Sequence, residues 1–220
     1  SVINNGIDTR RLREKASENP LCKKNLGLNS SDFIIGTIGR LHPIKRYDLL
    51  IEAFHEMSKE CTNPNKIPKL CIIGGGSEEK TLKILVLKLK IQNQVIFFGE
   101  RTDAYRFYPI FNCFVLSSAT EGLSIALLEA LSFGIPIITT NATKKHDVLE
   151  NEKHGIIIPP LNKKSLKEAL IQMYNHDDQR KMMSNNNLDL AETKFRICKT
   201  VDEYHELYKL HISSSKQNDY

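Results

Sequence analysis

Short apolar segments alternate with amphipathic ones along most of the chain. The apolar segments are rich in Ile, Val and Phe, which is typical of strands buried on both faces. They comprise residues 33–39, 69–74, 95–99, 113–118, 136–140 and 155–160. The segments with helical character between them are residues 46–60, 78–92, 103–111 and 124–134. This alternation predicts an α/β fold with a Rossmann-like, mostly parallel six-stranded sheet and helices on both faces.

The pattern changes in the last quarter of the chain. From residue 163 to about residue 210 the apolar positions recur with helical spacing only, which predicts C-terminal helices. The polar segment 211–220 is expected to be disordered. We therefore expect a single domain over residues 1–210. Because the chain begins with Ser1 rather than Met, we also expect it to be a fragment of a longer protein.

Composition narrows the class of protein. With 40% hydrophobic and 26% charged residues, the 220-residue chain is typical of soluble globular proteins. Its five cysteines are scattered without a CxxC pair, so we expect neither a zinc site nor a disulfide framework. This cysteine usage fits a reducing cytoplasm. The net charge of +5 suits an anionic ligand, or weak contact with the acidic inner face of a membrane. The absence of Trp and of basic–aromatic runs argues against nucleic acid.

The most informative feature is a pair of glutamates, Glu121 and Glu129, with seven residues between them. Glu121 follows the fourth apolar segment, and Glu129 falls two turns into the helix expected next. A separation of eight is about 800° of helix rotation, so the two side chains lie within roughly 80° of each other. Both can then face one cleft at the carboxyl end of a strand. A solvated helix face is the alternative, but the apolar residues from Leu123 to Leu131 favour partly buried glutamates with partners.

Cations follow the first strand. Gly39 and Arg40 lie at its end, and Lys45 comes five residues after Arg40. Glycine lets a ligand approach the backbone, while the Arg fork and the compact Lys charge can converge on phosphate oxygens. These residues could hold a diphosphate without a metal. His42 lies between them and is the best-placed histidine to line such a site, and His146 and His154 are expected on the same side.

Two further segments each allow two interpretations. The glycine turn at residues 74–76 precedes a helix, but it matches neither a P-loop nor a GxGxxG fingerprint, and a plain tight turn explains it equally well. The helix expected around residues 80–89 carries an apolar stripe flanked by lysines. Packing on its own sheet is the favoured explanation, and contact with an acidic membrane is the alternative.

Six motifs occur in an order that resembles the C-terminal half of retaining glycosyltransferases with the GT-B architecture, the group 1 or family 4 enzymes. The motifs are SVINNGID, GRLHPIKRYDLLIEAF, LCIIGGGSEE, VIFFGER, TEGLSIALLEALSFGIPIITT and GIIIPPLNKKSLKEAL. The resemblance extends from about Val2 to Leu210. It implies that the chain is one half of a GT-B architecture, the half that binds a nucleotide-sugar donor.

The resemblance also implies roles for individual residues. Arg40 and Lys45 would bind the donor diphosphate and stabilise the leaving group in place of a metal. Glu121 would bind the transferred sugar, and Glu129 the ribose hydroxyls. The further donor-binding positions that the resemblance implies are Gly39, Gly75, Gly76, Arg101, Gly122, Leu123 and Ser124. No cofactor is implied, because the UDP-, GDP- or ADP-sugar is a substrate.

These roles imply a retaining sugar transfer to a glycan, a lipid-linked saccharide or another acceptor. The acceptor would be bound by an N-terminal domain that this chain lacks, so the chain alone is expected to be inactive or weakly active. A GT-B epimerase or phosphorylase and a non-catalytic nucleotide-binding domain are the alternatives. A dinucleotide-binding module is disfavoured because GTIGRLHP lacks the glycine spacing that such a module requires.

Three departures from the family pattern bear on the site. Arg46 stands where the family usually has Gly, so we expect either an added cation near the phosphates or a shifted helix start. The family often has a Gly-Gly-x-x-Glu segment after the fifth strand. Here the segment is NATKKHDVLE, which includes Lys144, Lys145, His146 and Asp147. Phe or Pro often occupies the place of Leu123 or Ser124, a difference expected to influence sugar specificity.

Overall fold

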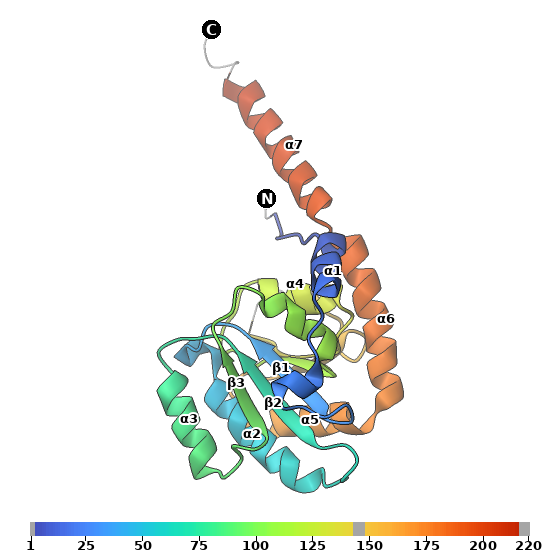
Figure 1. Cartoon of the computed structure of the whole chain (residues 1–220). Coiled ribbons are helices and arrows are strands. Elements are labelled where there is room, and N and C mark those ends of the chain that lie inside the picture. The colour runs from blue at the N-terminus through green and yellow to red at the C-terminus, as the bar shows by residue number, and fades with distance from the viewer. Residues whose placement is uncertain (1–2, 143–147, 216–220) are drawn as a thin grey trace.

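A six-stranded parallel sheet forms the centre of the computed structural model, which describes residues 3–142 and 148–215 (Figure 1). Its strands are β1 (Phe33–Ile38), β2 (Pro68–Ile73), β3 (Val95–Gly99), β4 (Cys113–Leu116), β5 (Ile137–Thr140) and β6 (Gly155–Ile158). The spatial order is β3-β2-β1-β4-β5-β6, and every pair is parallel. The six predicted strands are confirmed, and the sheet is fully rather than mostly parallel.

Apolar residues on both faces of the strands build two cores. The first lies between the sheet and the helices α2 (Tyr47–Glu60), α3 (Glu79–Lys88) and α5 (Lys163–Asn175). The second lies on the other face, beneath η3 (Ala104–Ile110), α4 (Ile125–Ser132) and α6 (Asp177–Lys194). Successive side chains of a strand point to opposite faces, so Ile35 enters the first core and Ile34 the second. The expected helices on both faces are therefore confirmed.

Some elements have no clear signal in the apolar pattern. The helix α1 (Thr9–Glu18) packs against η3 and α4, yet only Thr9 and Ala16 are buried in it. Two short 3-10 helices, η1 (Lys23–Leu26) and η2 (Pro43–Lys45), are likewise unpredicted. The segment expected to be helical at 103–111 is the 3-10 helix η3. Pro109 lacks the N–H that a regular α-helix needs at this position.

The last helix, α7 (Ile197–Ser215), extends away from the rest of the domain (Figure 1). It includes residues 211–215 of the segment for which we expected disorder. Residues 216–220 lie outside the described part of the chain. At its base α7 adjoins the N-terminal segment: Ile7 N donates to Phe195 O at 2.7 Å, and Ile197 N donates to Ile7 O at 3.1 Å. No helix among the described residues has the length and apolarity needed to cross a membrane.

The strand order creates a switch point at the carboxyl edge of the sheet. After β1 the chain turns towards β2, whereas after β4 it turns towards β5 on the other side. Because β1 and β4 are neighbours, the loops that follow them diverge from adjacent strands. Open parallel sheets bind ligands in the crevice at such a point.

Candidate active site

The loops after β1 and β4 are joined by hydrogen bonds at the switch point. Ala119 N donates to Ile44 O at 2.8 Å, and Ser117 Oγ donates to Lys45 O at 2.7 Å. The neighbouring loop after β5 is connected as well, because Thr140 Oγ1 donates to Ser118 O at 2.7 Å. These bonds hold the backbone around Lys45 against the turn that carries Glu121.

Lys45 and Glu121 form an ion pair, although they are far apart in sequence. The Lys45 ammonium donates to Glu121 Oε2, and Ser118 Oγ donates to the same oxygen at 2.9 Å. The side chains are 20% and 23% exposed, so the pair is partly shielded from water. The structure thus brings one predicted cation into contact with one predicted glutamate. Such a pair can release either partner to a charged ligand.

Glu121 does not belong to the helix that carries Glu129. The helix α4 begins at Ile125, and Ser124 has extended backbone angles of φ −70° and ψ 130°. Helical rotation therefore does not relate the two side chains, and the prediction that they share one helix face is wrong. The glycine at position 122 and the extended residue at 124 form a turn between strand and helix, and helical geometry does not apply there.

Glu129 is held by a partner of its own. Tyr108 Oη donates to Glu129 Oε2 at 2.8 Å and lies 3.1 Å from Ala126 O. Burial raises the pKa of Glu129, and the hydrogen bond from Tyr108 opposes that rise. Burial also raises the pKa of Tyr108 well above its usual range, so the phenol remains a donor. Glu129 is thus a half-buried, oriented carboxylate on α4.

Arg40 has a different environment from Lys45. It is exposed, and within the described residues its side chain has neither an ion pair nor a hydrogen bond. It lines a cavity of about 200 Å³, open to solvent, together with Gly39, Gly75 and Arg101. The cavity lies at the carboxyl ends of β1, β2 and β3. An unpaired guanidinium at its rim can bind phosphate oxygens in a fork.

Arg101 is held in place by a carboxylate. Its guanidinium donates to both oxygens of Asp103, at 2.7 and 2.9 Å, and its centre lies 5.4 Å from the centroid of the Phe107 ring. The hydrogen bond from Arg101 is the main reason why the pKa of Asp103 is lowered to about 2. Arg101 therefore presents a flat, oriented surface on the cavity wall rather than a free charge.

The predicted glycines differ in what surrounds them. A Cβ on Gly76, whose φ is +152°, would lie 2.4 Å from Leu41 O, and one on Gly39 would lie 2.9 Å from Tyr47 Oη. A Cβ on Gly75 would be 3.3 Å from Glu100 Cβ. Gly122, in contrast, is exposed, and its Cβ would meet nothing within 4 Å. Gly39 and Gly76 are thus required by close contacts and positive φ, and Gly75 is closely packed, whereas the space at Gly122 is open to a ligand.

The start of α4 adjoins this open space. The Ser124 side chain makes no cap hydrogen bond, so it satisfies none of the first backbone N–H groups of the helix. Leu123 and Ser124 are half-buried beside it. The N-terminus of a helix attracts anions through its dipole and its free N–H groups.

A second cavity lies on the other side of this turn. It is small, about 50 Å³, and is lined by Glu121, Gly122, Leu123, Ser124 and residues of and after β5 and β6. Neither this cavity nor the one at Arg40 is lined by Lys45 or Glu129. The predicted residues thus surround the switch point on two sides instead of lining one cleft. Lys144, Lys145, His146 and Asp147 lie outside the described residues.

The other predicted features have local roles. His42 is exposed, and its Nδ1 accepts from Ile44 N at 3.3 Å within its own turn. His154 is buried, and its Nδ1 accepts from Glu150 N at 3.0 Å, which points to a structural role. Arg46 pairs with Asp48 at 2.8 Å, and α2 begins directly after it, at Tyr47. Among residues 3–142 and 148–215 there is no cluster of His, Cys, Asp or Glu that could hold a metal.

Sequence reasoning missed the residues that orient the glutamates. Ser118 is the last residue of an apolar run, and Tyr108 lies in the segment that forms η3. An aromatic residue before proline gives no sign that its hydroxyl reaches a glutamate 21 positions later. The only available signal is general, because a buried tyrosine hydroxyl usually finds a partner.

A doubly wound parallel sheet, with a cationic loop and an acidic turn in contact at its switch point, defines the doubly wound α/β class, whose members bind their ligands at this point. The chain belongs to the family of group 1 glycosyl transferases, whose family model matches residues 19–189. The resemblance found in the motifs is therefore confirmed.

Relatives and solved structures agree with this assignment. The Escherichia coli enzyme UDP-Gal:alpha-D-GlcNAc-diphosphoundecaprenol alpha-1,3-galactosyltransferase is 29% identical over 209 residues, 94% of this chain and 53% of that enzyme. The Anabaena protein HepE in complex with UDP has a TM-score of 0.82 at 20% identity, covering 95% of this chain and 57% of HepE. The C-terminal domain of a Francisella tularensis group 1 glycosyl transferase, LpcC, has a TM-score of 0.67 at 21% identity.

The share of each protein that these matches cover shows which part of a glycosyltransferase this chain resembles. The LpcC domain is covered over 97% of its length by 89% of this chain. The chain therefore has the fold of the C-terminal domain of a group 1 glycosyltransferase, one half of the GT-B architecture. It spans about half the length of the curated relatives that it matches.

Proposed function

We propose that this chain is the donor-binding half of a retaining glycosyltransferase and binds a nucleotide-diphospho-sugar at the switch point. The observation that carries the proposal is the ion pair between Lys45 and Glu121, which joins the loops after β1 and β4. Arg40 is unpaired nearby, and the start of α4 is open. Cations and a helix N-terminus suit a diphosphate, and a carboxylate suits sugar hydroxyls.

The proposed mechanism exchanges the partners of this pair. When the donor diphosphate binds, Lys45 turns from Glu121 to the phosphate oxygens, and Arg40 binds them from the cavity at the end of β1. Glu121, still bonded by Ser118, becomes free to accept hydrogen bonds from the transferred sugar. The positive charges of Lys45 and Arg40 then stabilise the nucleoside diphosphate as it leaves. The sugar–phosphate bond breaks while the acceptor hydroxyl forms a bond to the same sugar carbon, and the proton of that hydroxyl passes to the departing phosphate. In this proposal neither a metal nor a cofactor takes part.

The nucleoside end of the donor is assigned to the other predicted residues. Glu129, oriented by Tyr108, accepts hydrogen bonds from the ribose hydroxyls. Arg101 presents its guanidinium plane on the cavity wall near the base. We propose UDP as the nucleotide, because UDP occurs in the HepE complex and UDP-Gal in the name of the E. coli relative. GDP and ADP are the alternatives to be tested.

The acceptor is proposed to bind on an N-terminal half that completes the cleft. The length of the relatives supports this, and so does α7, which leaves Ile197, Val201, Tyr204 and Tyr208 between 41% and 63% exposed. Their spacing places them on one side of the helix, a surface that a further domain can cover. The name of the E. coli relative favours a lipid-linked saccharide as acceptor. Such an acceptor would place the enzyme at a membrane surface, and the cytoplasmic face is the location proposed.

Calorimetry with UDP, GDP and ADP tests the donor site of the chain by itself. We expect UDP to bind, and Arg40→Ala and Lys45→Ala each to weaken binding by about 1.5–3 kcal/mol, the usual contribution of a hydrogen bond to a charged group. Arg10→Ala, on the exposed face of α1, is the matched control and should bind UDP normally. Binding of none of the nucleotides would support the non-catalytic alternative, and normal UDP affinity in both site variants would refute the assigned residues.

Transfer requires the complete enzyme. The chain alone is expected to show little or no sugar transfer from the donor. Joined to an N-terminal half, it should transfer with retention of configuration, which NMR of the product can establish. An inverted product would exclude the retaining mechanism, and strong turnover by the 220-residue chain alone would show that no second domain is needed.

A further inference from the structure

The solvent-facing side of α3 carries large apolar residues that do not pack against the sheet. Leu82 and Val86 are buried on the inner face of this helix and belong to the first core. Ile84 and Leu87, on the outer face, are 52% and 62% exposed. They lie three positions apart, about 300° of rotation, so their side chains are within roughly 60° of each other. Two large apolar side chains thus form a small patch in water.

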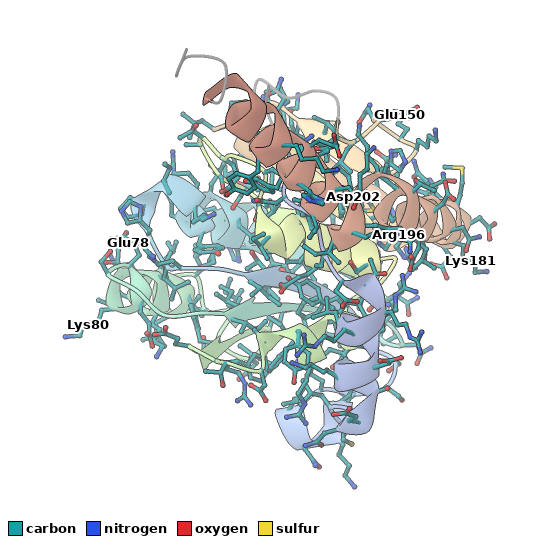
Figure 2. The ribbon with its side chains drawn as sticks, turned by 90° about the horizontal axis from the view of Figure 1, so that it is seen from above. Glu78, Lys80, Glu150, Lys181, Arg196 and Asp202 are labelled. Atoms are coloured by element: carbon teal, nitrogen blue, oxygen red, sulfur yellow. The ribbon has the colours of Figure 1, made fainter. Side chains whose placement is uncertain are left out.

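Lysines surround this patch. Lys80 precedes Ile84 by one turn, and Lys83 and Lys88 flank the two apolar residues on either side. Residues 79–90 contain four lysines and one glutamate, which gives a net charge of +3. Figure 2 shows Lys80 at the periphery of the molecule, pointing away from the ribbon.

The lysines of α3 differ from those of α5 in their partners. On α5, Lys163 and Lys167 each lie 2.9 Å from a glutamate of α2. On α3, Lys83 pairs with Glu79 at 2.6 Å, but Lys80 and Lys88 have no carboxylate partner among the described residues, and neither has Lys90 just beyond the helix. The positive charge of α3 is therefore mostly uncompensated. It is available to a negatively charged surface.

We propose that the outer face of α3 binds the surface of an anionic lipid bilayer. Ile84 and Leu87 would enter the boundary between headgroups and acyl chains, and the lysines would contact the lipid phosphates around them. A convex helix face with lysines around an apolar centre fits a planar surface of diffuse charge. The face has no aromatic residue to stack on nucleic acid bases.

The position of α3 would bring the donor site close to a lipid surface that the helix binds. The helix follows the glycine turn of Gly74 and Gly75, which line the cavity beside Arg40. Binding through α3 would thus hold the donor site close to the lipid surface. The inference does not rest on the proposed function, because the chain can bind lipid whether or not it binds a nucleotide.

Vesicle flotation of the 220-residue chain tests the proposal. We expect the chain to float with vesicles of equal parts phosphatidylcholine and phosphatidylglycerol, but not with phosphatidylcholine alone. Added salt should release it, because lipid charges and lysines are screened. The double variant Ile84→Ser with Leu87→Ser, and the double variant Lys80→Gln with Lys88→Gln, should each reduce the bound fraction at anionic vesicles by about tenfold.

A matched control removes the same kinds of side chain elsewhere. On α6, Lys181 is 78% and Met182 is 47% exposed, and Lys181→Gln with Met182→Ser should leave binding unchanged. Unaltered thermal unfolding shows that each variant is folded. The proposal is overturned if the wild-type chain fails to bind anionic vesicles, binds neutral ones equally, or retains its binding in the α3 variants. UDP affinity, measured separately, decides the proposed function.

Discussion

The hydroxyl of Tyr108 lies 2.8 Å from Oε2 of Glu129, where it orients a carboxylate on α4 that is largely shielded from water. Tyr108 itself is fully buried and packs against Phe114 and Phe133, with ring centroids 5.5 Å apart in both cases. Its position is therefore set by the core. The orientation of Glu129 thus depends on a residue outside the segment that contains the two glutamates.

Replacing Tyr108 with Phe should destabilise the domain. The ring packing is retained, but the Glu129 carboxylate loses a donor in a place where water cannot fully replace it. We expect the free energy of unfolding to fall by about 1–3 kcal/mol at neutral pH. Urea denaturation measures this change. Tyr208→Phe, on the exposed side of α7, is the control and should have no effect. Equal stability of the two variants would contradict the role given to the hydroxyl.

The pKa of Glu129 predicts a pH dependence of stability. Burial raises this pKa in the folded protein above its ordinary value of 4.5, so between the two values the folded state binds more protons than the unfolded state. Stability therefore falls as pH rises through this range. Glu129→Gln removes the effect, so the variant should gain stability relative to wild type above the folded pKa but not below pH 4.5. Urea titrations across this range test the sign, and a pH-independent difference would refute it.

Removing the charge of Glu121 should change nucleotide binding and sugar transfer in opposite directions. In Glu121→Gln, Lys45 loses its ion-pair partner and is freer to bind phosphate. We expect UDP to bind more tightly by about 1 kcal/mol, roughly fivefold in Kd. Transfer by the complete enzyme should decline, because the amide is a weaker acceptor for sugar hydroxyls. When Lys45 is already replaced by Ala, Glu121→Gln should bring no further gain in UDP affinity, because the two residues are coupled. Weaker UDP binding in Glu121→Gln would contradict the proposed exchange.

Two glycines of the site should respond differently to the same substitution. Gly76→Ala places a Cβ 2.4 Å from Leu41 O at a φ of +152° and should cost about 2–4 kcal/mol of stability. Gly122→Ala meets no atom within 4 Å, so the fold should be unaffected. Its methyl group enters the space assigned to the phosphates, and UDP affinity should fall by about tenfold. Thermal unfolding and calorimetry on both variants separate the two effects. Normal UDP binding by Gly122→Ala would remove that residue from the site.

The backbone of Arg46 predicts a stability order. Its φ of 52° and ψ of 44° are left-handed, which glycine adopts without strain. Arg46→Gly and Arg46→Ala both lose the ion pair with Asp48, but only alanine keeps the strained conformation. We expect the glycine variant to be more stable than the alanine variant by about 1 kcal/mol. Differential scanning calorimetry compares them. Equal melting temperatures would show that the left-handed geometry carries no strain.

The sheet was predictable because its strands are continuous apolar runs with both faces buried. Ile34 and Ile35, for example, enter opposite cores, and few other environments accept such a sequence. The helix α1 was not predictable, since it buries only Thr9 and Ala16 and otherwise consists of polar residues. Its position follows from tertiary contacts with η3 and α4, which leave no local pattern.

The sequence indicated candidate residues for the site but not their geometry. The motifs named Lys45 and Glu121 without indicating that they touch. That contact depends on the adjacency of β1 and β4, which is a property of the strand order. The placement of Glu121 on a helix was wrong because the turn around Gly122 precedes α4. The roles of these residues in donor binding stay predictions until nucleotide binding is measured.

The loop after β1 is bound to its neighbour by two backbone hydrogen bonds. Leu41 N donates to Gly75 O at 2.8 Å, and Glu78 N donates to Leu41 O at 3.1 Å. Leu41 itself is fully buried. The backbone beside Arg40 is therefore restrained at Leu41, even though it lies in a loop. Its amides should exchange slowly with deuterium, and little backbone entropy should be lost when an anion binds there.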